Sequence, residues 1–218
     1  EREGLVSLPD EPARVRMATP AETAQQPSAH LDIPRLVGNT GEFPEFIVPD
    51  IPRNEDGSWP VSDYAFPAMM WTLSAHEARP GHEMQFTTMI RGGVSTARAL
   101  FAFNSANVEG WALYAEAITK PSMPLEGQLL SLQHRLLRAA RIWLDPLLNL
   151  GLMSAEEAKR VLMEVVVEDE HYAQTEIDRY TFRMPGQATA YYYGYEHLQS
   201  LRAQTELRLK DKFNQKDF

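Results

Sequence analysis

Two histidines that flank a carboxylate are the residues whose types and spacing point most directly to chemistry. His76, Glu77 and His82 lie in the segment His-Glu-Ala-Arg-Pro-Gly-His, in a chain that contains six histidines. Imidazoles four residues apart return to one face of a helix and can share a zinc ion, with a neighbouring Glu as general base. Here the step is six residues, which on a regular helix leaves the two rings about 120° apart and unable to share an ion.

Two residues between the histidines break regular helical geometry. Pro80 has no backbone N–H to donate to the carbonyl of His76, and Gly81 can adopt backbone angles closed to other residues. The sequence therefore predicts a bulge or a helix break that brings His82 back toward His76. In the alternative interpretation, the two histidines only bracket a helix break and bind nothing.

A second segment supplies a carboxylate that could join the histidines. Glu109 begins the string Glu-Gly-Trp-Ala-Leu-Tyr-Ala-Glu on an apolar, aromatic-rich helix, where burying it requires a compensating cation or donor. A zinc ion would compensate it, with two imidazoles, one carboxylate and a fourth position left for water. Glu116, seven residues on and on the same helical face, could orient a ligand. Alternatively, Glu109 forms an ion pair with Arg98 or Arg141.

A third segment places a tyrosine where it could assist hydrolysis. Gln187, Tyr191, Gly194 and Tyr195 share one helical face, and the glycine allows close approach of another backbone. A phenol such as that of Tyr191 could donate a hydrogen bond to an oxyanion in a hydrolytic transition state. The alternative is that these tyrosines are simply packed.

The three segments together resemble the signature blocks of a known bacterial family. The strings at 76–85, 109–116 and 185–191 look like the three blocks of the "domain of unknown function 885" family, which is similar to the gluzincin metallopeptidases. The resemblance covers about residues 5–218. It implies that the chain is the C-terminal half of a longer protein. One departure is Glu83, where family members often have a second His after the ligand.

The resemblance implies a specific set of roles. His76, His82 and Glu109 would be zinc ligands and Glu77 the general base, with Tyr191 as the oxyanion donor proposed above. We therefore expect a zinc-dependent metallopeptidase that cleaves a peptide or related small amide substrate. The resemblance also implies an extracytoplasmic parent protein, periplasmic or a lipoprotein, and a partner in the N-terminal half of that protein.

Two other functional interpretations remain open at this point. The first is a non-catalytic helical interaction or scaffold domain with a structural or vestigial metal site, since fold and motif do not guarantee turnover. The second is a chain that holds the metal but is inactive without the missing half of the cleft. In either case the helices and the metal ligands would be the same.

Composition excludes several classes of partner and site. The 218 residues include 21 basic and 30 acidic side chains, a net charge of −9, so the sequence predicts no nucleic-acid partner. The absence of cysteine excludes disulfides and thiolate metal sites, so any metal must be held by His, Asp or Glu. The longest apolar runs are far shorter than the roughly 20 residues of a membrane-spanning helix.

The pattern along the chain predicts a mainly α fold with a multi-helix, gluzincin-like catalytic domain and a small N-terminal β-rich, proline-rich segment. Residues 1–64 hold much of the proline and predict extended or β structure without helices, and 65–218 predict the helical domain with the metal site. Strands are expected at 13–17 and 43–48, the latter able to pair with a peptide as an added strand. Helices are expected at 66–90 with an interruption, and at 96–118, 126–150, 154–169, 172–182 and 187–209.

Two of these helices have apolar periodicity that predicts their buried faces. Leu100 and Phe103 belong to the expected buried face of helix 96–118. Residues Leu129, Leu132, Leu136, Ala140, Trp143 and Leu147 recur at intervals of three and four along helix 126–150. We expect both faces to contact the core.

Overall fold

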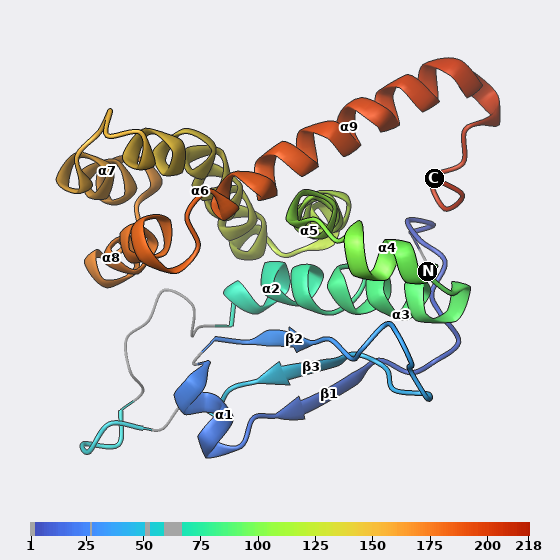
Figure 1. The fold of residues 1–218 in the computed structure, drawn as a ribbon, viewed down its shortest axis with the longest axis horizontal. Coiled ribbons are helices and arrows are strands. Elements are labelled where there is room, and N and C mark those ends of the chain that lie inside the picture. The colour runs from blue at the N-terminus through green and yellow to red at the C-terminus, as the bar shows by residue number, and fades with distance from the viewer. Residues whose placement is uncertain (1–2, 27, 51–52, 59–66) are drawn as a thin grey trace.

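A short N-terminal part with a small sheet precedes a long helical part (Figure 1). The structure is a computed structural model, and it describes residues 3–26, 28–50, 53–58 and 67–218. The mainly α fold class with a small N-terminal sheet is confirmed. The expected boundary between 1–64 and 65–218 lies outside the described residues, so this division stays a prediction.

The N-terminal sheet has three short strands. The central strand β3 (Glu45–Val48) pairs in parallel with β1 (Arg14–Met17) and antiparallel with β2 (His30–Asp32). The expected small β element is therefore confirmed, but the role given to residues 43–48 is wrong. Because β3 already has a neighbour on each side, it has no free edge to which a peptide could be added.

One helix lies in the segment that was predicted to have none. Helix α1 (Pro20–Gln25) begins after Thr19, whose hydroxyl accepts from the amide of Glu22, while the Glu22 carboxylate accepts from the amide of Thr19. Proline fits the first turn of a helix because its missing N–H would be unpaired there. The sequence contains the capping box of this helix, but the high proline content of the segment led to a prediction of no helix.

The first two helices of the helical part are separated by the expected break. Helix α2 (Met69–Glu77) and helix α3 (His82–Gly92) are joined by residues 78–81, and the Arg79–Pro80 peptide bond is cis. The indole N–H of Trp111 donates to the carbonyls of Pro80 and Gly81 at 3.0 and 3.2 Å, which holds this turn. Figure 1 shows α2 and α3 running alongside the sheet, above β2 in that view.

The helix expected at 96–118 is two helices. Helix α4 (Thr96–Phe101) ends before Asn104, and the Asn104 side chain then caps α5 (Ser105–Thr119) by accepting from the amide of Asn107 at 2.8 Å. The expected burial of Leu100 and Phe103 is wrong, because both lie on or beside α4 and are 58% and 60% exposed. The apolar periodicity therefore continues across two helices, and the N-cap Asn104 marks where the second one begins.

Helix α6 (Leu125–Asn149) buries a different face from the one predicted. Leu129, Leu132 and Leu136 are 67%, 46% and 43% exposed, so most of the expected core face is outside. The buried face combines apolar and polar side chains: Ser131, His134, Leu137, Arg138, Ala140, Arg141, Leu144 and Asp145. Burial of charged groups on this scale requires partners from other elements.

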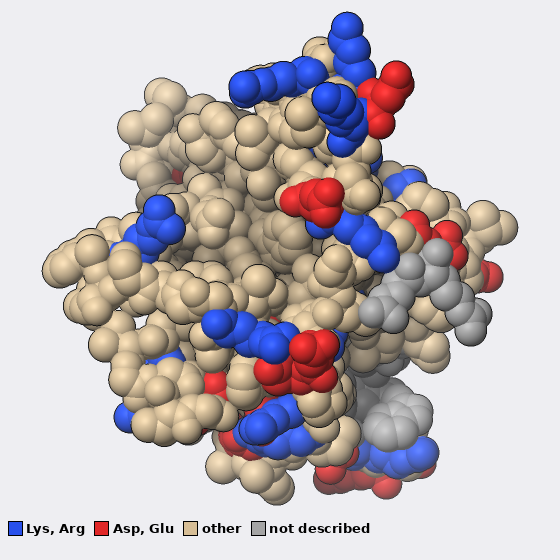
Figure 2. Space-filling model, turned by 90° about the vertical axis from the view of Figure 1, so that its right-hand side faces the viewer, with Lys and Arg blue, Asp and Glu red and all other residues tan. Residues whose placement is uncertain are grey.

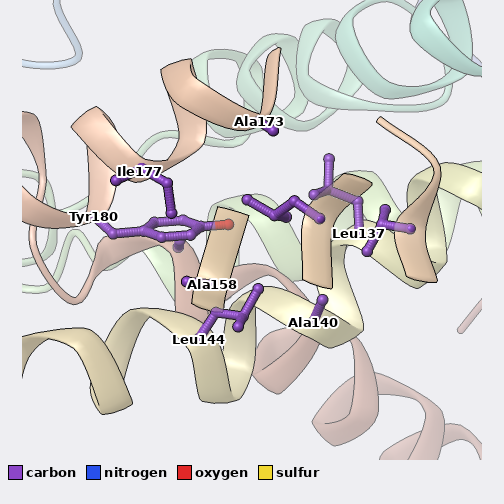
Figure 3. Close-up of a cluster of buried hydrophobic side chains, with 10 residues drawn as sticks. Leu137, Ala140, Leu144, Ala158, Ala173, Ile177 and Tyr180 are labelled. Atoms are coloured by element: carbon purple, nitrogen blue, oxygen red, sulfur yellow. The ribbon is translucent and has the colours of Figure 1, made fainter. Parts of the chain in front are cut away.

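The remaining helical elements complete the C-terminal part. In chain order they are η1 (Lys120–Ser122), α7 (Ala155–Val161), the π-helical turn η2 (Leu162–Val166), α8 (Glu170–Asp178), the π-helical turn η3 (Arg179–Arg183), η4 (Gln187–Thr189), α9 (Ala190–Leu209) and η5 (Lys210–Lys212). The expected capping box of Ser154 with Glu157 is confirmed. Figure 3 shows the core that these elements build, with Leu137, Ala140 and Leu144 of α6 near Ala158, Ala173, Ile177 and Tyr180.

A buried ion pair lies beside this core. Arg141 of α6 donates to both carboxylate oxygens of Glu176 of α8, at 2.6 and 2.7 Å, and the hydroxyl of Tyr180 donates to Glu176 at 2.6 Å. Burial raises the pKa of Glu176, but the Arg141 charge lowers it more, to about 2. The carboxylate therefore stays ionised and fixes α6 against α8.

Helices α5 and α9 approach each other closely enough for their backbones to be in contact. A methyl group added at Gly110 of α5 would lie 2.5 Å from the backbone of Gly194, and one added at Gly194 would lie 1.9 Å from the carbonyl oxygen of Ala106. Glycine at both positions therefore lets the two backbones touch, as the sequence predicted for Gly194.

One face of the molecule carries charged side chains of both signs (Figure 2). Figure 2 shows a face on which coloured Lys and Arg side chains are interspersed with Asp and Glu, around a hollowed and mostly uncharged middle. Across the part of the chain that the structure describes, no helix has both the length and the apolar character that crossing a bilayer requires.

Replacing Gly194 with Ala should separate α5 from α9. The added methyl group meets backbone that cannot rotate away, so we expect a loss of about 1–3 kcal/mol in the free energy of unfolding. Gly92→Ala is the matched control, because the space around Gly92 is open within 4 Å and alanine favours a helix. Denaturant unfolding measures both, and equal stability of the two variants would contradict the close contact.

Replacing Glu176 with Gln should remove an acid-sensitive part of the stability. Arg141 loses its buried partner, so the variant should be about 3–5 kcal/mol less stable at neutral pH. Because the pKa of Glu176 is lowered from 4.5 to about 2, this contribution is fully present above about pH 4.5 and disappears as the pH falls toward 2. Denaturant unfolding at several pH values should show that the difference in unfolding free energy between wild type and variant decreases as the pH falls from about 4.5 toward 2. Glu170→Gln, at a mostly exposed carboxylate, is the control.

Candidate metal centre

Three side chains from three helices converge at the break between α2 and α3. His76 lies near the end of α2, His82 begins α3, and Glu109 lies in the first turns of α5. One ligand atom of each lies within 4.8 Å of the others, and the two imidazole rings are 4.8 Å apart. The break thus brings the two imidazoles together, as the sequence predicted, and their role as metal ligands stays a prediction.

The distances around Glu109 fit a shared cation better than hydrogen bonds. Its Oε2 lies 3.4 Å from Nε2 of His76 and 3.4 Å from Nε2 of His82, longer than an ordinary N–H···O contact. Ligands on a tetrahedral ion with bonds of about 2.1 Å are roughly 3.4 Å apart. This Oε2 is also buried and has no hydrogen-bond partner among the described residues. Two imidazoles and an unpartnered carboxylate oxygen are a donor set suited to a divalent transition metal.

A further carboxylate orients His76 from the other side. Glu116 Oε1 accepts from Nδ1 of His76 at 2.6 Å, and Glu116 Oε2 accepts from the hydroxyl of Thr72 at 3.1 Å. Arg138 Nη2 lies 3.6 Å from the same carboxylate. With Nδ1 held by Glu116, Nε2 of His76 faces Glu109 and the site, where it could bind a metal ion after losing its proton. Glu116 therefore occupies the position predicted for a residue that orients a ligand.

The electrostatics of the site come from burial opposed by close charges. Burial lowers the pKa of His76, but the larger opposing effect of Glu109 and Glu116 raises it, and the net pKa is about 9. Burial raises the pKa of Glu116, but the charges of Arg138 and His76 lower it to about 2. The pKa of Glu109 also lies well below its usual range, because its two imidazole neighbours outweigh its burial. Both carboxylates are therefore held ionised at neutral pH.

The two residues expected to assist the reaction lie next to the candidate ligands. Glu77 is half-buried at the end of α2, and its charge contributes to the raised pKa of His76. The Tyr191 ring stacks on the His76 ring at 6.3 Å between centres, with 20° between the planes. Its hydroxyl oxygen accepts from Nη2 of Arg179 at 3.0 Å. The structure thus brings Glu77 and Tyr191 to the same place as the candidate ligands.

The alternative ion pairs for Glu109 are wrong. Arg141 pairs with Glu176, and Arg98 is exposed on α4. The charged partners of Glu109 within 4 Å, among the described residues, are His76 and His82.

Sequence reasoning missed the arginines that surround Tyr191. The guanidinium carbons of Arg138, Arg141 and Arg179 lie 5.9, 4.9 and 5.4 Å from the centre of its ring. These cations neighbour the phenol from α6 and η3, and two of them are buried. Cation–π contacts of this kind fix a ring that would otherwise be held by packing alone.

Asp145 was also missed, and it positions the start of the last helix. Its carboxylate accepts from the backbone amides of Gly186 and Ala188 at 2.8 and 3.2 Å. A visible signal existed, because polar residues recur along helix α6 at intervals of three, four, three and four: Ser131, His134, Arg138, Arg141 and Asp145. A polar stripe with helical spacing predicts one face with a common environment.

Comparison with solved structures supports the fold. The chain is similar to a protein called a "putative lipoprotein" from Colwellia psychrerythraea, with a TM-score of 0.79 and 26% identity over 97% of this chain and 35% of that one. It is also similar to a "putative lipoprotein of unknown function" from Shewanella oneidensis, with a TM-score of 0.81 and 22% identity over 100% of this chain and 39% of that one. The chain thus spans little more than a third of each.

Comparison with protein families identifies the chain more closely. No curated protein sequence matches it. The family described as "Bacterial protein of unknown function (DUF885)" matches residues 2–218. Since the match extends over nearly the whole chain, this protein belongs to the DUF885 family.

Proposed function

We propose that the chain carries the active site of a zinc-dependent hydrolase, a metallopeptidase related to the gluzincins that cleaves peptide or similar amide bonds. The observation that carries the proposal is the buried Oε2 of Glu109, which has no hydrogen-bond partner among the described residues and lies 3.4 Å from each of two imidazole nitrogens. A carboxylate is rarely left in that condition unless a cation completes its surroundings.

The donor set favours zinc and leaves room for chemistry. His76, His82 and Glu109 would hold the ion through Nε2, Nε2 and a carboxylate oxygen, and three protein ligands are typical of catalytic rather than structural zinc. When bound, zinc lowers the pKa of a water ligand and polarises the substrate carbonyl. Glu116 keeps the proton of His76 on Nδ1, so that Nε2 is available as a ligand.

The residues around the ligands can move the protons that hydrolysis requires. Glu77 accepts a proton from the attacking water as its oxygen bonds to the carbonyl carbon, and then gives that proton to the amine as the C–N bond breaks. Tyr191 accepts a hydrogen bond from Arg179, so its own O–H is free to donate to the oxyanion that develops. Each of these roles uses a side chain that lies against the metal ligands.

The names of the solved relatives support a proposal about the cellular setting. Both carry a lipoprotein name, so we propose an extracytoplasmic location for the protein. Both are also much longer than this chain, which supports a functional unit that includes polypeptide corresponding to the rest of those structures. If the substrate cleft is formed jointly with that polypeptide, this chain alone should bind metal but turn over slowly.

Metal analysis tests the ligand set. We expect about one zinc per chain in protein purified without chelator, and loss of that zinc in His82→Ala because two ligands cannot retain the ion. His171→Ala is the matched control, since His171 is exposed on α8 and far along the chain from the centre. Elemental analysis measures both. Zinc retained at wild-type stoichiometry in His82→Ala would contradict the site.

Replacing Glu77 with Gln tests catalysis separately from binding. The amide has nearly the same shape but cannot accept the proton, so hydrolysis of a peptide mixture should fall at least about 100-fold. Zinc content should stay at one per chain, because Glu77 is not a ligand in this proposal. Equal hydrolysis by the variant and wild type would remove Glu77 from its role. Zinc without hydrolysis in either protein, even after the remaining polypeptide is added, would favour the scaffold interpretation.

A further inference from the structure

Arg179 carries a positive charge that its neighbours do not balance. Its Nη2 donates to the side-chain oxygen of Gln187 at 2.6 Å and to the hydroxyl of Tyr191 at 3.0 Å, and both acceptors are neutral. Within 4.0 Å of its guanidinium, the described residues supply one carboxylate, that of Glu176, at the limit of that range. The Nε of Arg179 is buried without a hydrogen-bond partner in the described part of the chain.

Glu176 is committed to other groups. Arg141 donates two hydrogen bonds to it at 2.6 and 2.7 Å, and the hydroxyl of Tyr180 donates a third at 2.6 Å. Because Arg141 alone neutralises this carboxylate, the charge of Arg179 remains in excess. An uncompensated guanidinium next to a reaction centre favours an anionic group as its partner.

The position of Arg179 is suited to contact with a substrate. It hydrogen bonds to Tyr191, whose ring stacks on the metal ligand His76. Its side chain retains 23% of its exposure, whereas those of Arg138 and Arg141 retain 10% and 7%. Of the three arginines around the phenol, Arg179 is therefore the one most open to a ligand.

The spacing of phenol and guanidinium corresponds to the end of a peptide. At the C-terminus of a peptide, the carbonyl carbon of the last peptide bond and the carbon of the free carboxylate are separated by two atoms. These are the nitrogen and the Cα of the last residue. That separation is roughly 3–4 Å. The hydroxyl of Tyr191 and Nη2 of Arg179 are 3.0 Å apart. If the carbonyl oxygen of a substrate's last peptide bond accepts a hydrogen bond from Tyr191, the free α-carboxylate of that substrate therefore lies within reach of the Arg179 guanidinium.

We infer that Arg179 binds the free carboxylate at the C-terminus of the substrate, so that the site removes single residues from the carboxyl end of peptides or from N-acyl amino acids. The hydrolytic part of this inference rests on the proposed function. The recognition part, a preference for a carboxylate over a neutral carboxamide, stands on the arrangement of Arg179, Tyr191 and Glu176 alone.

A binding experiment tests the recognition without requiring turnover. Zinc-loaded Glu77→Gln protein is titrated calorimetrically with an N-acetyl dipeptide that ends in a carboxylate and with the same dipeptide that ends in a carboxamide. We expect the carboxylate to bind about 10- to 100-fold more tightly. Adding Arg179→Gln should abolish the difference, whereas adding Arg183→Gln, at an exposed arginine of the same turn, should leave it intact.

Each outcome bears on the inference. Equal affinities of the two dipeptides, binding of neither at millimolar concentration, or a preference that survives Arg179→Gln would each overturn it. If Arg179→Gln does not fold, Arg179→Lys replaces it and should reduce the preference, because lysine keeps the charge but loses the two-pronged geometry. Failure of the proposed function is distinguishable. In that case wild-type protein cleaves neither dipeptide, although the carboxylate is still preferred in binding.

Discussion

The buried carboxylates of helix α5 are the constraint on which the site depends. Glu109 and Glu116 lie seven residues apart on one face, and each must find compensation inside the protein. One imidazole serves both, since Nε2 of His76 faces Glu109 and Nδ1 faces Glu116. This double contact fixes the distance and rotation of α2 relative to α5. Once that relation is set, the break at Pro80 and Gly81 determines where α3 begins and thus where its first histidine lies.

Helix α9 is tied to the same framework from the opposite side. Gly110 and Gly194 let its backbone contact α5, and Asp145 of α6 anchors the turn at Gly186 that precedes it. The ring of Tyr191 therefore reaches His76 through two constraints that are independent of each other. A change in either contact would move the phenol, even though neither contact involves a side chain at the site. The arrangement of the candidate site thus depends largely on backbone packing outside it.

The sequence predicted which side chains converge at the candidate site only where the nearby residues themselves constrained the geometry. The expected convergence of His76 and His82 followed from the residues between them, and the approach of Glu109 followed from the cost of burying it. The buried face of α6 was wrongly predicted because two stripes run along this helix. Apolar periodicity favoured the stripe with Leu129, whereas the stripe with Arg141 is inside. Its partners, such as Glu176, come from elements that are distant in sequence and invisible to a helical pattern.

The choice of a polar stripe for the interior of α6 has a physical explanation. Replacing a buried ion pair with apolar side chains of similar volume is often neutral or stabilising, so stability alone does not explain Arg141 and Glu176. Arg141 also stacks on Tyr191, while Arg138 lies beside Glu116 and helps to keep it ionised. A leucine at position 141 would remove one of the three cations around the phenol, and a leucine at position 138 would remove the guanidinium beside Glu116. The interior of α6 therefore serves the geometry and charge of the site at the expense of a simpler hydrophobic core.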